Sequence, residues 1–323
     1  MAEPLLRVEA LTKRYPLGGG LFGRKSRREV HALEDVSFDV FRGETLGIVG
    51  ESGCGKSTLG KTLLRLQEPT GGRVFFEGRE LTALSPRAMR AERRHLQMVF
   101  QDPYSSLNPR LRIGDALLEP LIIHDIGSGR AERAARVREL LGQVGLPAEA
   151  AERYPHEFSG GQRQRIVIAR ALAAGPRIVV ADEPVSALDV SVQAQVLNLM
   201  RDLQEQYSLT YLFIAHDLRI VQYMSARVAV MYLGRIVELA GADELYARPA
   251  HPYTRLLLSA VPVPDPSKTR ARLPILGEVP DPASPPTGCA FHPRCAIAEA
   301  RCRSEAPALR EVAPGHLAAC HLA

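Results

Sequence analysis

The sequence lacks any long hydrophobic run. Nowhere in its 323 residues do apolar side chains continue for the roughly 18 positions that a transmembrane helix requires. The first ten residues also lack a basic segment followed by an apolar one, so they do not resemble a signal peptide. We therefore expect a cytoplasmic protein. If the protein serves a membrane process, the membrane-spanning part must lie on other chains.

Cysteine is scarce as well, with five residues in the chain. Cys54 stands alone in a glycine-rich stretch, and the other four gather near the C-terminal end. In a reducing cytoplasm, a local cluster favours metal or iron–sulfur ligation over disulfides. The spacing C-x₅-C-x₆-C-x₁₇-C lacks the tight pairs of zinc fingers, so a [4Fe–4S] cluster, a zinc ion and an empty site all remain open. The four residues are Cys289, Cys295, Cys302 and Cys320.

Charge of one sign is not in large excess, because the net charge is only +5 at pH 7. Short basic clusters occur at residues 24–28 and 90–94, where solvated loop and helix faces are the simpler explanation. We therefore expect no nucleic-acid partner.

The apolar residues follow a pattern typical of an α/β protein. Continuous apolar runs, such as residues 178–181 and 210–215, belong to the interior of a parallel sheet, and an amphipathic segment between them predicts a crossover helix. Two stretches, residues 16–29 and 249–286, predict a surface insertion and irregular chain, because they are rich in glycine and arginine or in proline. The expected strands are 5–10, 36–41, 45–49, 178–181, 210–215, 228–232 and 236–239, and the expected helices are 56–66, 162–174 and 192–203.

A glycine-rich loop from Gly50 to Ser57 satisfies the pattern G-x-x-x-x-G-K-[ST] between an expected strand and an expected helix. Glycines let successive backbone N–H groups point inward, and the helix N-terminus adds its positive dipole end. Lys56 would bring its charge to the β- and γ-phosphates, and Ser57 would offer a hydroxyl to Mg²⁺. The loop therefore predicts a nucleotide site, formed by Ser52, Gly53, Cys54, Gly55, Lys56, Ser57 and Thr58.

Two acidic residues follow the apolar run at 178–181. A carboxylate at the end of a buried strand is suited to hold the Mg²⁺ shell, which predicts this role for Asp182. Glu183, the next residue, is then expected to orient or deprotonate the attacking water.

A second helix start, at residues 158–165, begins with the sequence Phe-Ser-Gly-Gly-Gln. Its free N–H groups and serine hydroxyl would form another anion-binding end, which the first nucleotide site does not need. An additional anion-binding helix N-terminus of this kind is explained if it contacts ATP that is bound by another subunit. The residues concerned are Ser159, Gly160, Gly161 and Gln162.

Together these motifs resemble those of the ATP-binding cassette (ABC) family, over residues 5 to about 262. The resemblance implies that Tyr15 stacks on adenine, that Gln101 contacts Mg²⁺ and senses the transmembrane partner, and that His216 reaches the γ-phosphate. It also implies that residues 186–189 cross the interface of a head-to-tail dimer. Catalysis would then rest on Glu183, His216 and Lys56, and Mg²⁺ on Ser57, Gln101 and Asp182.

The fold that the resemblance implies is an α/β P-loop NTPase of ABC type, with a RecA-like core, an antiparallel β subdomain and a helical subdomain. The nucleotide-binding domain would span residues 1–262, with the helical subdomain at about 102–175. Residues 263–323 would form a short proline-rich extension that bears the four cysteines.

Three further segments are similar to ATPase subunits of bacterial dipeptide and oligopeptide importers: residues 157–166, 183–195 and 251–254. Residues 105–110 and the pair Val185-Ser186 favour the F-type subunit. The resemblance implies a heterodimer with a D-type ATPase, two membrane permeases and an extracytoplasmic substrate-binding protein. The chain would lie at the cytoplasmic face of the bacterial inner membrane, with Tyr104 to Arg112 as its contact surface for a permease.

Other members of the family keep some alternatives open. Importers of nickel or glutathione share these motifs closely. Non-transport cassette ATPases typically fuse two cassettes or insert a coiled coil, and this sequence shows neither. Some peptide-importer ATPases carry a [4Fe–4S] cluster in the same tail, which here favours that cluster over zinc.

Overall fold

The chain is organised as two compact units, and the computed structural model describes residues 3–17, 28–261 and 276–323. The first unit comprises Met1–Val40, Leu46–Thr82 and His216–Ala323, and the second comprises Phe41–Thr45 and Ala83–Ala215. Both units therefore combine segments that lie far apart in the sequence.

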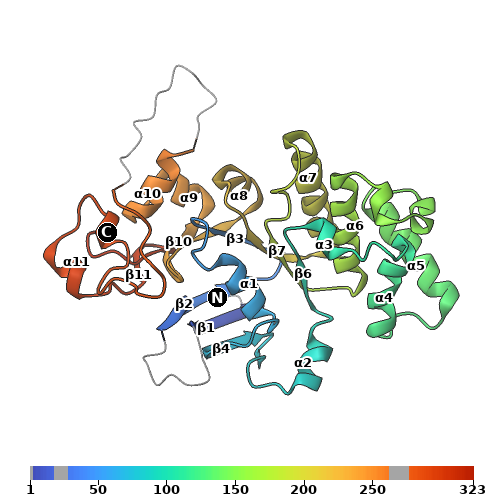
Figure 1. Cartoon of the computed structure of the whole chain (residues 1–323), viewed down its shortest axis with the longest axis horizontal. Helices are drawn as coiled ribbons and strands as arrows, with labels where there is room; N and C mark the ends of the chain where they lie inside the picture. Colours follow the sequence, from blue (N-terminus) through green and yellow to red (C-terminus); the bar gives the residue numbers. More distant parts are fainter. Residues whose placement is uncertain (1–2, 18–27, 262–275) are drawn as a thin grey trace. The chain divides into compact units, whose positions relative to one another are not determined.

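One sheet of the first unit is antiparallel, with strand order β2-β1-β4-β5 (Figure 1). Val8 of β1 pairs with Phe38 on one side and with Val74 on the other. Apolar residues on alternate positions of β1 are buried and Arg7 between them is exposed, because successive strand residues face opposite sides of a sheet. The strands are β1 (Leu6–Leu17), β2 (Arg28–Val40), β4 (Gly71–Phe76) and β5 (Arg79–Glu80).

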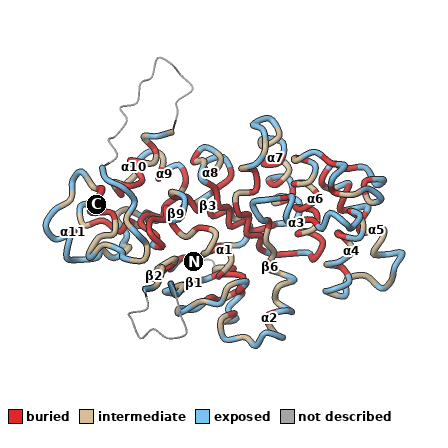
Figure 2. Tube along the Cα trace, viewed as in Figure 1, coloured by how far each residue is buried: buried red, intermediate tan, exposed pale blue. Residues whose placement is uncertain are grey.

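A second set of strands in the first unit follows the order β11-β12-β10-β9-β3. The pair β3 and β9 is parallel, and all five residues of β3 are buried, as the red trace in Figure 2 shows. These strands are β3 (Thr45–Val49), β9 (Arg227–Tyr232), β10 (Arg235–Gly241), β11 (Arg310–Ala313) and β12 (His316–Ala318). The helices of the unit are α1 (Lys56–Leu63), α8 (Leu218–Met224), α9 (Ala242–Ala247), α10 (Pro252–Ser259), α11 (Ala300–Ser304) and the 3₁₀ turn η3 (His292–Arg294).

The C-terminal extension joins this sheet through a wholly buried carboxylate. Glu238 on β10 has no exposed surface, and β12 pairs with β10 at this residue. Its oxygens accept hydrogen bonds from the backbone N–H groups of Ala250, at 2.7 Å, and of His251, at 3.0 Å. The ring nitrogen Nε2 of His316, from β12, lies 2.7 Å from the same carboxylate. The buried charge is therefore compensated mainly by groups that follow β10 in the sequence.

The second unit contains three parallel strands in the order β8-β7-β6. Helix α7 connects β7 to β8, as the buried apolar runs predict, and α6 packs against α3, α4 and α5 (Figure 1). The strands are β6 (Leu96–Val99), β7 (Ile178–Asp182) and β8 (Thr210–Ile214). The helices are α2 (Pro86–Glu92), α3 (Pro103–Ser106), α4 (Ile113–Ile123), α5 (Arg130–Gln143), α6 (Gly160–Ala173) and α7 (Val190–Tyr207), with 3₁₀ turns η1 (Ala148–Glu152) and η2 (Pro155–Glu157).

The predictions of irregular chain were partly wrong. Residues 249–286 include α10, which begins at a proline in its first turn and is capped by the His251 side chain, so the prolines here start a helix instead of preventing one. The expected insertion at 16–29 is shorter, because β1 continues to Leu17 and β2 begins at Arg28. Residues 18–27 and 262–275 lie outside the described part of the chain.

Across residues 3–17, 28–261 and 276–323, no helix is both long and apolar enough to cross a membrane.

Candidate functional site

The glycine-rich loop runs from the end of β3 to the start of α1, in the context that its sequence predicts. Its three glycines all have positive φ, 154° at Gly50, 79° at Gly53 and 105° at Gly55, and the chain packs closely against Gly50 and Gly55. A Cβ at Gly50 would lie 2.3 Å from the carbonyl oxygen of Met231, and one at Gly55 would lie 2.3 Å from that of Ala32. The loop is therefore folded tightly onto the rest of the first unit, with no room for a larger residue at either glycine.

Lys56, the first residue of α1, places its charge inside this loop. The side chain is buried, and its ammonium donates hydrogen bonds to the carbonyl oxygens of Gly50, at 2.8 Å, and of Glu51, at 3.0 Å. Ser57 and Thr58 follow on the helix and are half-buried. A buried ammonium at a helix N-terminus, surrounded by loop backbone, is suited to a polyphosphate.

Cys54 lies in the same loop, while its neighbours Ser52 and Gly53 are exposed. The thiol is buried, its Sγ is 3.9 Å from the Lys56 nitrogen, and burial raises the pKa of the thiol. The residue thus behaves as a small buried filler of the loop.

Tyr15 and His216 are the other two predicted nucleotide contacts that belong to the first unit. Tyr15 is half-buried near the end of β1, its hydroxyl hydrogen-bonds to the side chain of Gln67, and the Lys13 ammonium lies 4.8 Å from its ring centroid. His216 is exposed and precedes α8. The first unit therefore carries the glycine-rich loop, Tyr15 and His216.

The second unit carries the predicted carboxylates and Gln101. Asp182 ends β7 and is buried, and the next residue, Glu183, has a φ of 48°. A non-glycine residue in this region is strained, which is common at functional sites. The Glu183 N–H donates to the carbonyl oxygen of Ile214 at 2.9 Å. Its carboxylate accepts a hydrogen bond from Nε2 of Gln101 at 3.0 Å, so two of the predicted catalytic-site residues are brought together directly.

The Ser159–Gln162 segment begins α6 with a capping box. Ser159 Oγ accepts from the N–H of Gln162 at 3.3 Å, and Gln162 Oε1 accepts from the N–H of Ser159 at 3.0 Å. The N–H groups of Ser159 and Gln162 are thus paired within the segment, and the anion-binding role of this helix start stays a prediction. Gly160 and Gly161 supply the remaining first-turn backbone.

The predicted dimer-interface segment, residues 186–189, precedes α7. Gln193 Nε2 fixes the backbone of this segment by donating hydrogen bonds to the carbonyl oxygens of Val185 and Leu188, each at 3.0 Å. Val190, directly after the segment, has 82% of its surface exposed. A single exposed valine is ordinary at a protein surface, so the place of this segment in a dimer interface stays a prediction.

The four cysteines of the extension line one small cavity of about 20 Å³, together with side chains that include His251 and Phe291. All four are free thiols. Burial and the neighbouring cysteines raise the pKa of Cys289 and of Cys295. Among the described residues, no three His, Cys, Asp or Glu side chains are arranged to hold a metal ion, so the thiols surround one point without forming a ready ligand set.

His251 lines the same cavity, and one of its ring nitrogens has a structural role. Its Nδ1 accepts a hydrogen bond from the N–H of Tyr253 at 3.1 Å, and burial lowers the pKa of its ring to about 4. The ring is therefore neutral and caps α10.

Sequence reasoning missed one contact of the glycine-rich loop. Arg294, next to Cys295, forms two hydrogen bonds with the carboxylate of Glu51, of 2.7 Å and 2.9 Å. The two residues are 243 positions apart, so no local pattern signals the pair.

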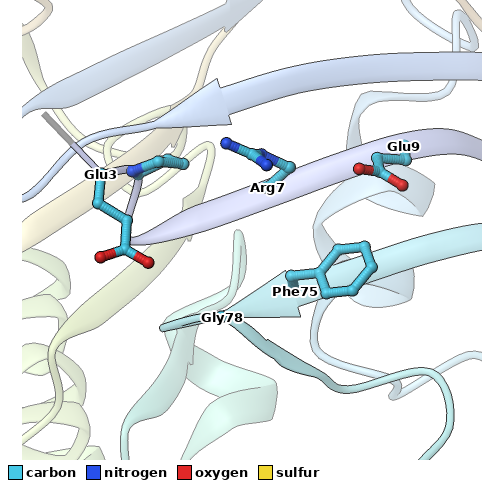
Figure 3. A pocket seen from close by; sticks show the side chains of 6 residues that line it. Glu3, Arg7, Glu9, Phe75 and Gly78 are labelled. Carbon is cyan, nitrogen blue, oxygen red and sulfur yellow. The ribbon is translucent and has the colours of Figure 1, made fainter. Parts of the chain in front are cut away.

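A cavity of about 230 Å³ is lined by none of the predicted site residues. It is lined by residues of β1 and β4 and their flanks, including Arg7, Glu9 and Phe75, as Figure 3 shows. Two of its charged side chains are already paired, Arg7 with Asp39 and Glu9 with Arg73. We therefore assign it no part in the nucleotide site.

Comparison with known proteins decides the family. Residues 33–186 match the family model described as "ABC transporter". The "Probable peptide ABC transporter ATP-binding protein y4tS" of Sinorhizobium fredii is 55% identical over 322 residues, which are 100% of this chain and 91% of the relative. The chain belongs to the ABC transporter ATP-binding proteins. ATP binding and ATP hydrolysis coupled to transport are the activity of this family.

The remaining comparisons extend the assignment to both ends of the chain. Residues 237–302 match the model "Oligopeptide/dipeptide transporter, C-terminal region". The "Oligopeptide transport ATP-binding protein AppF" of Bacillus subtilis is 53% identical over 323 residues, covering 99% of this chain and 98% of AppF.

Two solved structures confirm the ABC-type α/β fold that the sequence predicts. One is the dimeric ATP-binding cassette MJ0796 in a post-hydrolysis state bound to ADP and Pi, with a TM-score of 0.64, 29% identity, and coverage of 73% of this chain and 98% of that one. The other is cbiO1 from Clostridium perfringens, part of the ABC transporter complex cbiONQ, with a TM-score of 0.65, 26% identity, and coverage of 76% and 91%. The domain boundaries at residue 262 and at about 102–175 stay predictions.

Proposed function

We propose that this chain is the ATP-hydrolysing subunit that energises a membrane importer of dipeptides or oligopeptides. The observation that carries the proposal is the presence, on one chain, of an ABC cassette and an oligopeptide/dipeptide-transporter C-terminal region. The relatives y4tS and AppF match almost the whole chain, and their names support peptides as the substrate class.

The residues of the loop fit a bound nucleotide. The β- and γ-phosphates require hydrogen-bond donors and a cation. The backbone N–H groups at the start of α1 supply the donors, and the buried Lys56 ammonium supplies the positive charge. The tight fold at Gly50 and Gly55 leaves the backbone as the inner wall of the loop. Ser52, Gly53, Cys54, Gly55, Ser57 and Thr58 complete the proposed phosphate contacts, and Tyr15 is the proposed adenine contact.

Oxygen atoms suited to Mg²⁺ come from Ser57, Gln101 and Asp182. A hard divalent cation prefers hydroxyl, amide and carboxylate oxygens, and the buried Asp182 carboxylate supplies the negative charge. When bound, Mg²⁺ would neutralise charge on the phosphoryl oxygens.

Hydrolysis then depends on groups that act on water and on the γ-phosphoryl. Glu183 orients the attacking water and takes its proton, while Gln101 holds the Glu183 carboxylate through the 3.0 Å hydrogen bond. Lys56 and His216 stabilise the charge that develops on the γ-phosphoryl. The capped start of α6, with Ser159, Gly160, Gly161 and Gln162, faces the nucleotide of a second cassette in a head-to-tail dimer.

The proposed partners are a D-type ATPase that completes a heterodimer with this F-type chain, two transmembrane permeases and an extracytoplasmic substrate-binding protein, with no nucleic acid. The chain would act at the cytoplasmic face of the bacterial inner membrane. For the permease contact, we propose Tyr104 to Arg112. Tyr104 is 62% exposed, and the Arg163 guanidinium lies 4.1 Å from its ring centroid, which fixes the ring at the surface.

Within the extension we propose a [4Fe–4S] cluster, with zinc as the alternative. The chemistry of the donors fits, because four free thiols line one cavity, although some movement is needed before all four could ligate. Iron and sulfide analysis of anaerobically purified protein tests the cluster. Colourless protein that is free of iron would refute it.

Co-expression with candidate permease subunits tests the transport role. We expect the chain to co-purify with a two-permease membrane complex whose ATPase activity rises when peptide-loaded binding protein is added. ATPase activity that stays unchanged with peptide but rises with nickel or glutathione would contradict peptide import.

A further inference from the structure

An ion pair between a buried arginine and a half-buried glutamate connects the C-terminal extension to the glycine-rich loop. The Arg294 side chain is 3% exposed, and both of its terminal nitrogens bind the Glu51 carboxylate, at 2.7 Å and 2.9 Å. Two parallel charge-assisted hydrogen bonds fix direction as well as distance. Both residues belong to the first unit, so this contact lies within one compact body.

Glu51 is tied at all of its polar groups. Its N–H donates to the hydroxyl of Tyr253 at 2.9 Å, its carbonyl oxygen accepts from the Lys56 ammonium at 3.0 Å, and its carboxylate binds Arg294. The residue that Arg294 holds therefore also helps to place the Lys56 charge.

Aromatic packing stiffens the same connection. Phe291 of the extension contacts Tyr232 edge-on, at a centroid distance of 5.3 Å, and lies 5.4 Å from Tyr253. Tyr253 is completely buried, so its ring is held rigidly and its hydroxyl keeps a fixed position next to the Glu51 N–H. The contact between loop and extension is thus a packed cluster and not an isolated surface pair.

The other end of the connection is the cysteine cavity. Arg294 ends η3, between Cys289 and Cys295, and both cysteines line that cavity together with Phe291. The Cys289 N–H also donates to the carbonyl oxygen of Cys302 at 2.9 Å. The backbone that carries Arg294 is therefore set by how the extension folds around its four thiols.

We propose that Arg294 is a positioning residue of the nucleotide site, which makes ATP affinity depend on the folded state of the C-terminal extension. Arg294 holds Glu51, and Glu51 holds the loop backbone and Lys56 in the conformation that receives phosphate. The positioning role of Arg294 rests on the proposed role of the glycine-rich loop in ATP binding. A purely structural pair would hold the extension onto the cassette without changing nucleotide affinity.

The test measures binding of a fluorescent N-methylanthraniloyl-ATP to the full chain. Arg294→Met and Glu51→Gln should each raise Kd about tenfold, a typical coupling between linked sites. The double variant should bind ATP about as weakly as either single variant, well short of the roughly hundredfold loss that independent effects would give, because both changes break one interaction. Arg294→Lys, which keeps the charge, should recover part of the affinity, and Arg301→Met is the matched control because Arg301 binds the carbonyl oxygen of His321, within the extension.

Far-UV circular dichroism and thermal melting separate folding from affinity. If Arg294→Met does not fold, Arg294→Lys and the uncharged double variant give the same comparison. Kd values within about twofold of wild type in folded variants, with only the melting temperature lowered, would overturn the proposal. Lys56→Ala keeps the two hypotheses apart: unchanged affinity in that variant would refute the role of the loop itself, whatever Arg294 does.

Discussion

Replacing Glu183 with glutamine should stop ATP hydrolysis while leaving ATP binding intact. The substitution keeps the shape of the side chain, and the glutamine oxygen can accept the same 3.0 Å hydrogen bond from Gln101. The left-handed backbone at φ 48° is present in both proteins, so its strain, about 1–3 kcal/mol, cancels in the comparison. What is lost is the negative charge and the proton acceptor.

The expected magnitude follows from that loss. A positioned general base contributes about 10²- to 10⁴-fold, so kcat should fall by that factor. The Kd for ATP should stay within about threefold, because no proposed phosphate contact is removed. We also expect size-exclusion chromatography with ATP to show a trapped closed dimer.

The assay is phosphate release by the reconstituted transporter, beside nucleotide binding by the isolated chain. Glu205→Gln is the matched control, because Glu205 is an exposed carboxylate on α7, outside all proposed roles. Near-normal turnover by the Glu183 variant would remove this residue from its role, and equal losses in both variants would show that the effect is not specific.

Three further outcomes are expected. Gly55→Ala should weaken nucleotide binding at least about tenfold, because its Cβ would meet the Ala32 carbonyl oxygen at 2.3 Å; calorimetric titration showing wild-type affinity would contradict the geometry. Cys54 should alkylate slowly at neutral pH and faster as the pH rises, because its raised pKa leaves little thiolate, and mass spectrometry should find modified protein unable to bind ATP; rapid labelling at pH 7 would disprove its burial. Tyr104→Ala should lose permease co-purification but keep nucleotide binding by the isolated chain, and an intact complex would move the contact elsewhere.

The predictable part of the molecule is the part with local rules. The glycine-rich loop and its flanking strand and helix follow from residues 45–66, because the turn, the helix start and the apolar strand are each specified by neighbours in sequence. The apolar runs at 178–181 and 210–215 are the parallel strands that their continuous burial predicts.

The unpredictable part depends on distant pairs. The Arg294–Glu51 pair joins positions 243 residues apart, and neither residue type is unusual for its surroundings. In the same way, proline density at 249–286 hides α10, since a proline in the first helical turn costs nothing and the cap comes from the His251 side chain.

The pairing of β12 with β10 has a consequence for how this protein can be divided. Without the final residues, the edge of β10 would present open backbone groups to any neighbouring chain, and Glu238 would lose the imidazole of His316. A cassette shortened to the nucleotide-binding portion alone would then be prone to aggregation through this strand edge and poorly soluble. The tail is for this reason an integral part of the folding unit, and catalytic measurements belong on the undivided polypeptide.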